Sequence, residues 1–393
     1  MGNVERLVES PFPARWSDNW VIDMRRWQDH LTFGRPISSG DQSSDGSDEI
    51  ILSGMVISGD DLLVHPGYVC LKGGRIKEVG QERTRMEEHI IAPALVNSHT
   101  HLADGLSKDP PYAPLSQLVG PGGLKHRLLE SASCEELRSS MRSAALEMLG
   151  GGTCAFADFR EGGPSGVSLL LDALHGLPLI SRIFGRPDPG GTDIHPDCFG
   201  LGLSSTRDHP WEWVKRAAVA ARSRGMHLAV HAGESGRDDI ESALSLQPDL
   251  LIHLTSATPA DLEKVAGTGA SVAVCPRSNL ATGCGLPDIS AMVGLGINVC
   301  VGSDNLMLNS TNLFREMELI SKALLHDDRQ VFKMCTLNGA KALGLEQEIG
   351  SIEVGKAARI MVVSASSRNM KGSRDPLASL VRRAEPSDIL AVF

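Results

Sequence analysis

Four histidines and one aspartate stand where apolar runs of the sequence end. His99 and His101 close the run PALVNSHTHLADG, while MHLAVHAGES supplies His231, LLIHLTSAT supplies His253 and INVCVGSDN supplies Asp304. A lone histidine at such a position is more often a satisfied polar residue, and a lone aspartate is more often a helix cap. Together, however, imidazoles and a carboxylate are the ligand set that a first-row divalent cation prefers. The pattern therefore predicts a metal site.

The elements that must position these residues have the spacing of βα units. Eight apolar runs begin near Leu95, Thr153, Pro178, Phe199, Met226, Asp249, Ser271 and Ile297, and a stretch with helical periodicity or charge lies between successive runs. This pattern predicts an α/β protein with a (β/α)₈ barrel, in which catalytic groups lie at the carboxyl ends of the strands. A doubly wound sheet is the alternative, but it should carry a glycine-rich phosphate loop after its first strand. No such motif follows that run.

Domain limits follow from changes of composition along the chain. We expect an N-terminal extension and flexible linker over residues 1–48, because that segment closes with the tract SSGDQSSDGSDE. Three tryptophans in it, at 16, 20 and 27, fit one stripe of a helix over about 15–31, which would bind a partner or pack on the protein's own surface or a subunit interface. Residues 49–93 and 348–393 are predicted to form a small composite β-sandwich, and residues 94–347 the barrel.

Composition excludes several classes of function. The 38 basic and 48 acidic residues give a net charge of −10, so nucleic acid is not an expected partner. No apolar run approaches the roughly 20 residues of a membrane span, and no signal peptide is recognisable. We expect a cytoplasmic protein whose eight cysteines, none in a CxxC pair, are reduced.

From Ile50 to about Ala384 the sequence resembles the amidohydrolase superfamily of metal-dependent hydrolases. Within it, the chain is similar to the branch that holds the cytosine, guanine and S-adenosylhomocysteine-type deaminases and the triazine chlorohydrolases, and above all to predicted archaeal members. The motifs that carry this resemblance are PALVNSHTHLAD, HAGE, IHLTSAT, CPRSN, GSDN and the closing NGAKALGL…GSIEVGKAA.

The resemblance implies that His99, His101, His231 and Asp304 hold one divalent metal ion, zinc by default and iron as the alternative. Binuclear members of the superfamily use a carboxylated lysine at the end of the fourth strand. Here that strand end reads FGLGLSST and has no lysine, so we predict a mononuclear site. Whether His253 is an additional ligand stays open.

In such enzymes the glutamate that corresponds to Glu234 shuttles a proton to the ring nitrogen of the substrate. The histidine that corresponds to His253 hydrogen-bonds the attacking water or the new oxygen. The physical chemistry agrees, because a bound divalent ion brings the pKa of water from about 15.7 to about 7 and Asp304 can accept a proton as the water attacks. Expelling ammonia from an aromatic amidine carbon also requires a proton donor, and Glu234 is placed to be one.

The leading hypothesis is therefore a metal-dependent hydrolase of non-peptide carbon–nitrogen bonds that deaminates a small heterocycle, such as a purine, pyrimidine or pterin-like ring. In a second hypothesis, the same metal ion and catalytic residues release chloride or an alkylamine, or open a cyclic amide. A third is a catalytically silent binding or assembly protein, against which the intact set of ligands argues. A homo-oligomer is compatible with all three.

Substrate contacts are predicted among polar residues near the same strand ends. Arg160, Arg186 and Arg277 would bind an anionic or carbonyl-bearing substituent, or else form salt bridges with neighbouring acidic residues; Arg160 is the favoured contact. Asn279 and Asn305 would hydrogen-bond the edge of a heterocycle. The long segment after the first barrel strand is either a lid over the site or a rigid surface loop.

Overall fold

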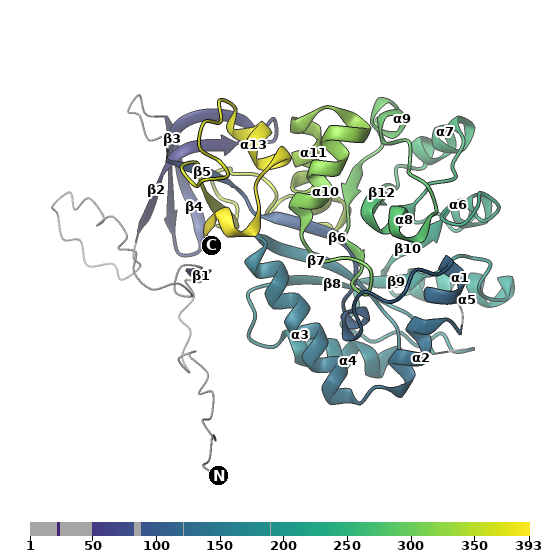
Figure 1. The fold of residues 1–393 in the computed structure, drawn as a ribbon. Helices are drawn as coiled ribbons and strands as arrows, with labels where there is room; N and C mark the ends of the chain where they lie inside the picture. Colours follow the sequence, from purple (N-terminus) through teal and green to yellow (C-terminus); the bar gives the residue numbers. More distant parts are fainter. Residues whose placement is uncertain (1–21, 24–48, 82–87, 121, 189) are drawn as a thin grey trace, which may run out of the picture.

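A ring of parallel strands forms the larger part of the molecule, and a smaller sheet lies beside it (Figure 1). The computed structural model describes residues 22–23, 49–81, 88–120, 122–188 and 190–393. The ring strands are β6 (Leu95–His101), β7 (Thr153–Arg160), β8 (Ile180–Gly185), β9 (Gly200–Leu203), β10 (His227–Ala232), β11 (Leu250–His253), β12 (Ser271–Val274), β13 (Val299–Val301) and β14 (Asp304–Asn305).

The last two strands are two pieces of one chain segment, and they close the ring. β13 pairs with β12 on one side, and β14 pairs with β6 on the other, so each side of this segment is hydrogen-bonded in parallel register. The ring is therefore an eight-stranded barrel, which confirms the predicted (β/α)₈ fold. All of β6, β7, β9, β11, β12 and β13 is buried, as expected of strands that have the barrel interior on one face and helices on the other.

Helices follow the barrel strands and cover the outside of the ring (Figure 1). Two of them begin with capping boxes, made by Ser133 with Glu136 and by Thr258 with Asp261, which satisfy backbone N–H groups at the helix start. The barrel helices are η2 (Leu102–Leu106), α1 (Leu115–Leu118), α2 (Leu124–Ser131), α3 (Cys134–Gly150), α4 (Gly163–Leu174), α5 (Trp211–Ser223), α6 (Ile240–Ser245), α7 (Pro259–Thr268), α8 (Pro276–Thr282), α9 (Ile289–Gly294), α10 (Leu313–Leu319), η3 (Ile320–Leu325), α11 (Asp328–Met334) and α12 (Leu337–Ala342).

The smaller sheet joins segments from both ends of the chain. Its strands, in spatial order, are β1 (Ile22–Asp23), β16 (Ile389–Val392), β15 (Ile360–Ser364), β5 (His89–Pro93), β2 (Ile50–Ser58), β3 (Leu63–Lys72) and β4 (Arg75–Gln81), with α13 (Pro376–Arg382) and η4 (Pro386–Asp388) between β15 and β16. β5 pairs antiparallel with β15, and one residue separates β5 from the first barrel strand. The two β-rich ends do meet, whereas the two-layer sandwich and the exact domain limits stay predictions.

One prediction for the N-terminal extension is wrong. Ile22–Asp23 lie within the helix predicted over about 15–31, but they form β1 and pair antiparallel with β16. An edge strand offers unpaired backbone groups, which a short extended segment satisfies better than a helix does. The three tryptophans on which the helix prediction was based lie outside the described residues. In the described part of the chain, no helix is both long and apolar enough to cross a membrane.

Candidate metal centre and active site

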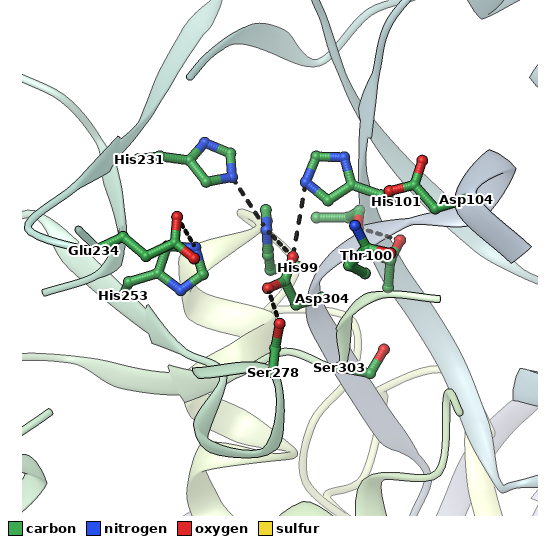
Figure 2. A network of polar contacts seen from close by, with 12 residues as sticks. His99, Thr100, His101, Asp104, His231, Glu234, His253, Ser278, Ser303 and Asp304 are labelled. Atoms are coloured by element: carbon green, nitrogen blue, oxygen red, sulfur yellow. Dashed lines mark hydrogen bonds and ion pairs between the residues drawn. The ribbon is translucent and has the colours of Figure 1, made fainter. Parts of the chain in front are cut away.

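The barrel brings the four predicted histidines and the predicted aspartate to one end of the ring (Figure 2). Asp304 Oδ1 lies 3.2 Å from His99 Nε2 and 3.8 Å from His101 Nε2. His231 Nε2 lies 3.3 Å from His99 Nε2. Two overlapping groups, His99 with His101 and His231 and His99 with His253 and Asp304, each have donor atoms within 4.8 Å of one another.

These side chains have the protonation states that a cation requires. Burial lowers the pKa of His99 and of His231, and it lowers the pKa of His101 to about 3, so their rings are neutral near pH 7. His231 Nδ1 lies 2.8 Å from the carbonyl oxygen of Leu203, which can only accept. The ring hydrogen therefore lies on Nδ1, and the Nε2 lone pair faces His99.

The donor set fits one divalent cation. Nitrogens with free lone pairs that face each other at 3.3 Å repel unless a proton or a cation lies between them. Asp304 adds the negative charge: burial alone would raise its pKa, but the neighbouring His99 ring holds that pKa well below the usual range. His99, His101, His231 and Asp304 would hold the ion, and His253 remains close enough to be a further ligand.

The carboxylate of Asp304 is held by backbone shape and by a hydroxyl group. Asp304 has φ of +61°, a left-handed conformation that a non-glycine residue adopts only where its surroundings enforce it. Ser278 Oγ donates a hydrogen bond to Asp304 Oδ2 at 2.5 Å, which leaves Oδ1 directed at His99. Ser278 belongs to the motif CPRSN, yet its serine was not among the predicted site residues.

Glu234 and His253 form a pair beside the histidine cluster. Glu234 Oε2 lies 3.6 Å from His253 Nε2, and both residues line the central cavity. Burial raises the pKa of Glu234, which favours a carboxyl group able to donate a proton near neutral pH. His253 has φ of +75°, so this second residue of the site is also in the left-handed region.

Asn279 contacts His253 rather than the cavity. Its Nδ2 lies 3.0 Å from His253 Nδ1, and the residue is completely buried. An Asn279 amide nitrogen that donates to Nδ1 places the ring hydrogen on Nε2, which faces Glu234, whereas the reversed amide would place that hydrogen on Nδ1 and leave Nε2 free for an ion. Asn279 therefore orients His253 in this structure, and it is not among the residues that line the cavity.

The cavity at this end of the barrel has a volume of about 540 Å³, within the range of small-molecule sites. The segment after β6 forms part of its wall, through Leu115, Val119 and Lys125. Of the predicted substrate contacts, Asn305 and Arg186 line it. This placement leaves the choice between a lid and a rigid loop open.

The structure does not bring Arg160 or Arg277 to the cavity. Arg160 is buried, and its guanidinium lies 2.8 Å from Glu161 Oε2 and 3.5 Å from Asp158 Oδ1. Arg277 lies 3.6 Å from Glu316 Oε1. Both arginines thus form the salt bridges that were the alternative interpretation, because neighbouring carboxylates already occupy their donors. A substrate contact by either residue stays a prediction without a geometric basis here.

Sequence reasoning missed a buried lysine next to the cluster. Lys125 Nζ lies 2.8 Å from Glu161, 3.0 Å from Asp104 and 3.2 Å from His101 Nδ1. Burial alone would raise the pKa of Glu161, but Lys125 and His101 hold it well below the usual range. Lys125 follows no strand, and no spacing relates it to the histidines, so the sequence offered no signal for it.

The closed barrel and a histidine-rich centre at its strand ends define a class of barrel hydrolases that use metal ions. The chain belongs to the amidohydrolase family, whose sequence profile matches residues 90–193 and 200–393. This membership confirms the resemblance predicted from the motifs, and the protein is accordingly a hydrolase.

Two relatives illustrate the range of similarity. A protein of Methanothermobacter thermautotrophicus that carries the name aminohydrolase is 34% identical over 380 residues, covering 87% of this chain and 96% of its own length. A 5-methylthioadenosine/S-adenosylhomocysteine deaminase of Moorella thermoacetica is 27% identical over 392 residues, covering 88% and 90%.

Solved structures support the fold. An adenosine deaminase from Xanthomonas campestris with bound zinc superposes with a TM-score of 0.70 at 20% identity, covering 87% of this chain and 91% of its own. A triazine hydrolase from Arthobacter aurescens gives a TM-score of 0.73 at 20% identity, covering 87% and 94%. At this identity the likeness concerns the fold alone.

Zinc binding should stabilise the folded protein, because the unfolded chain has no assembled ligand set. At free zinc of 100 times Kd the free energy of unfolding should rise by about 2.7 kcal/mol. Differential scanning calorimetry at several zinc concentrations measures this as a rising Tm. His231→Asn should abolish the rise, whereas the exposed His175→Asn should keep it. A Tm that does not respond to any divalent ion would contradict the metal site.

Gly302→Ala should disturb the site through contact alone. A Cβ at Gly302 would lie 2.5 Å from His99 Cβ and 2.7 Å from the His99 carbonyl oxygen. β6 must therefore move away from the segment that holds β13 and β14. We expect a loss of about 1–3 kcal/mol in stability and weaker zinc binding. Gly294→Ala, where nothing lies within 4 Å, is the matched control. Unchanged zinc affinity in Gly302→Ala would show that moving His99 does not affect zinc binding, and would contradict His99 as a ligand.

Proposed function

We propose that the protein is a mononuclear metal-dependent aminohydrolase that deaminates a small heterocycle, such as a purine, pyrimidine or pterin-like ring. One observation carries this proposal: the partly buried Glu234 lies 3.6 Å from His253 at the edge of the histidine cluster and faces a cavity of about 540 Å³. The names of relatives, among them 5-methylthioadenosine/S-adenosylhomocysteine deaminases, support the substrate class.

A single zinc ion is the proposed cofactor, with iron as the alternative. β9 ends at Leu203 and continues through Ser204 and Ser205, so no lysine stands where a carboxylated lysine could bridge two ions. Lys125 approaches the cluster from α2 but is engaged by carboxylates. When bound, the ion would supply Lewis acidity that makes water acidic enough to furnish hydroxide near neutral pH.

The chain's own residues account for the proton transfers of a deamination. Asp304 accepts a proton from the water as its oxygen bonds to the carbon that carries the amino group. Glu234 donates a proton to the adjacent ring nitrogen, which accepts the electron pair of the C=N bond. Asp304 then passes its proton to the amino nitrogen, the C–N bond breaks and ammonia leaves, while the new hydroxyl group gives its proton to Glu234 and the carbon becomes a carbonyl. A His253 ring that carries its hydrogen on Nε2 can donate to the oxygen during these steps.

The second hydrolytic hypothesis differs from the deaminase in the bond that breaks. Chloride needs no proton to depart, so a chlorohydrolase does not require a partly buried carboxyl group with a raised pKa; Glu234 therefore favours the deaminase. Release of an alkylamine or opening of a cyclic amide would use the same residues. A catalytically silent binding protein has no need of the strained Asp304 and the oriented His253.

Glu234→Gln should abolish ammonia release while leaving zinc bound, because the amide keeps the side chain's shape but cannot transfer a proton. We expect kcat to fall by about 10²–10⁴-fold, the usual contribution of a general acid–base group. The assay is ammonia release by zinc-loaded or iron-loaded protein across aminopurines, aminopyrimidines, their nucleosides and pterins.

Glu241→Gln, an exposed carboxylate on α6, is the control and should match the wild type. If Glu234→Gln releases ammonia at the wild-type rate, Glu234 is not the proton donor. If the wild type is silent across the panel with metal bound, but releases chloride or an alkylamine or opens a cyclic amide, the deaminase assignment is wrong.

A further inference from the structure

A largely buried group of charges lies beside Nδ1 of His101. Three cations and three carboxylates belong to it: Lys125, Arg160 and Arg186, with Asp104, Asp158 and Glu161. Lys125 is 5% exposed and Asp104 is 4% exposed, so their charges are stable only as a paired set. The proposed reaction assigns no role to this group, yet it contacts a candidate metal ligand directly.

The two ring nitrogens of His101 face different partners. Nε2 lies on the side of Asp304, at 3.8 Å from its Oδ1, and Nδ1 lies 3.3 Å from Glu161 Oε1 and 3.2 Å from Lys125 Nζ. A ligand histidine needs its free lone pair on the metal side, so its ring hydrogen must lie on the opposite nitrogen. For His101 that hydrogen must lie on Nδ1, and of the two neighbours only the carboxylate of Glu161 can accept it.

Lys125 would have the opposite effect if it bonded to the ring. An ammonium group can only donate, so a hydrogen bond from Lys125 to Nδ1 would place the ring hydrogen on Nε2 and block the metal-facing lone pair. The shorter distances from Nζ, 2.8 Å to Glu161 and 3.0 Å to Asp104, are to carboxylates, which attract an ammonium group more strongly than a neutral ring does. An ammonium group carries three donors, so its hydrogen-bond contact with Nδ1 at 3.2 Å competes with Glu161 for that nitrogen, and it is the longest of the three contacts of Nζ.

Glu161 is fixed by the same contacts. Lys125 binds its Oε1, and Arg160 binds its Oε2 at 2.8 Å, which leaves Oε1 beside His101 Nδ1. Lys125 is the member of the group that comes from α2, in the segment after β6, whereas Glu161 and Arg160 come from the end of β7 and the residue after it. Contacts from outside the strands thus reach the histidine cluster through Lys125.

We propose that Lys125 is a positioning residue of the metal centre, which orients Glu161 so that this carboxylate accepts the Nδ1 hydrogen of His101 and leaves Nε2 free for the ion. The proposal rests on the proposed function only in taking His101 as a ligand, and it holds whatever the substrate. It also gives α2 a part in metal binding besides its part in the cavity wall.

Zinc affinity is the measurement that tests the proposal, by competition of the metal-free protein with a fluorescent chelator. Lys125→Met and Glu161→Gln should each weaken zinc binding by about 10–100-fold, the usual effect of losing such a partner. Because both substitutions affect the same hydrogen bond, the double variant should bind zinc no more weakly than the single variant that has the lower affinity. Arg127→Met, on the same helix but exposed, should match the wild type.

Wild-type affinity in Lys125→Met would overturn the proposal, and so would losses that multiply in the double variant. A wild-type protein that binds zinc no better than His101→Gln would instead refute His101 as a ligand, and with it the proposed metal set. The two failures are therefore distinguishable.

A second measurement determines the tautomer of His101 in the wild-type protein. In metal-free wild-type protein labelled with ¹⁵N in histidine, the ring signals of His101, assigned by their loss in His101→Gln, report which nitrogen carries the hydrogen. We expect the hydrogen on Nδ1. A hydrogen on Nε2 would show that Lys125 bonds to the ring, and the proposal would be wrong.

Discussion

Burial of uncharged imidazoles at one end of a closed barrel is the constraint on which the site depends. His99 is completely buried and His101 nearly so, and at that depth a protonated ring is unfavourable. Neutral rings keep lone pairs that point at one another, an arrangement that a divalent cation stabilises and an apolar core does not. The deep position of Asp304, with its left-handed backbone, supplies the negative charge that such a cation requires.

Neighbouring residues orient the side chains of this cluster through hydrogen bonds. Ser278 and Asn279, both in the first turn of α8, contact Asp304 and His253 respectively, so one short helix orients two functional side chains. Leu203 fixes the ring of His231 from β9. These contacts set the geometry before any substrate enters, which reduces the reorganisation that the reaction must make.

The barrel and the five central residues could be predicted because both depend on regular spacing. Strands of a parallel barrel end on one face, so His99, His231 and Asp304 meet once the strands are recognised. Arg160 shows where that reasoning stops: residue type placed it near the site, but its neighbours Asp158 and Glu161 decide that it forms salt bridges. In the sequence, Lys125 lies far from any strand, and only the tertiary fold brings it to His101. The strand at Ile22 depends likewise on a partner that lies 370 residues along the chain, at Val392.

X-ray absorption spectroscopy of the zinc-loaded protein tests the central claim most directly, because it reports the atoms around the ion without reference to a substrate. We predict one zinc ion with three or four imidazole nitrogens and an oxygen in its first shell, at about 2.0–2.2 Å. Variation of His99 or Asp304 should remove the corresponding imidazole or oxygen. A spectrum with sulfur ligands, with a second metal nearby, or with water oxygens alone would contradict the account.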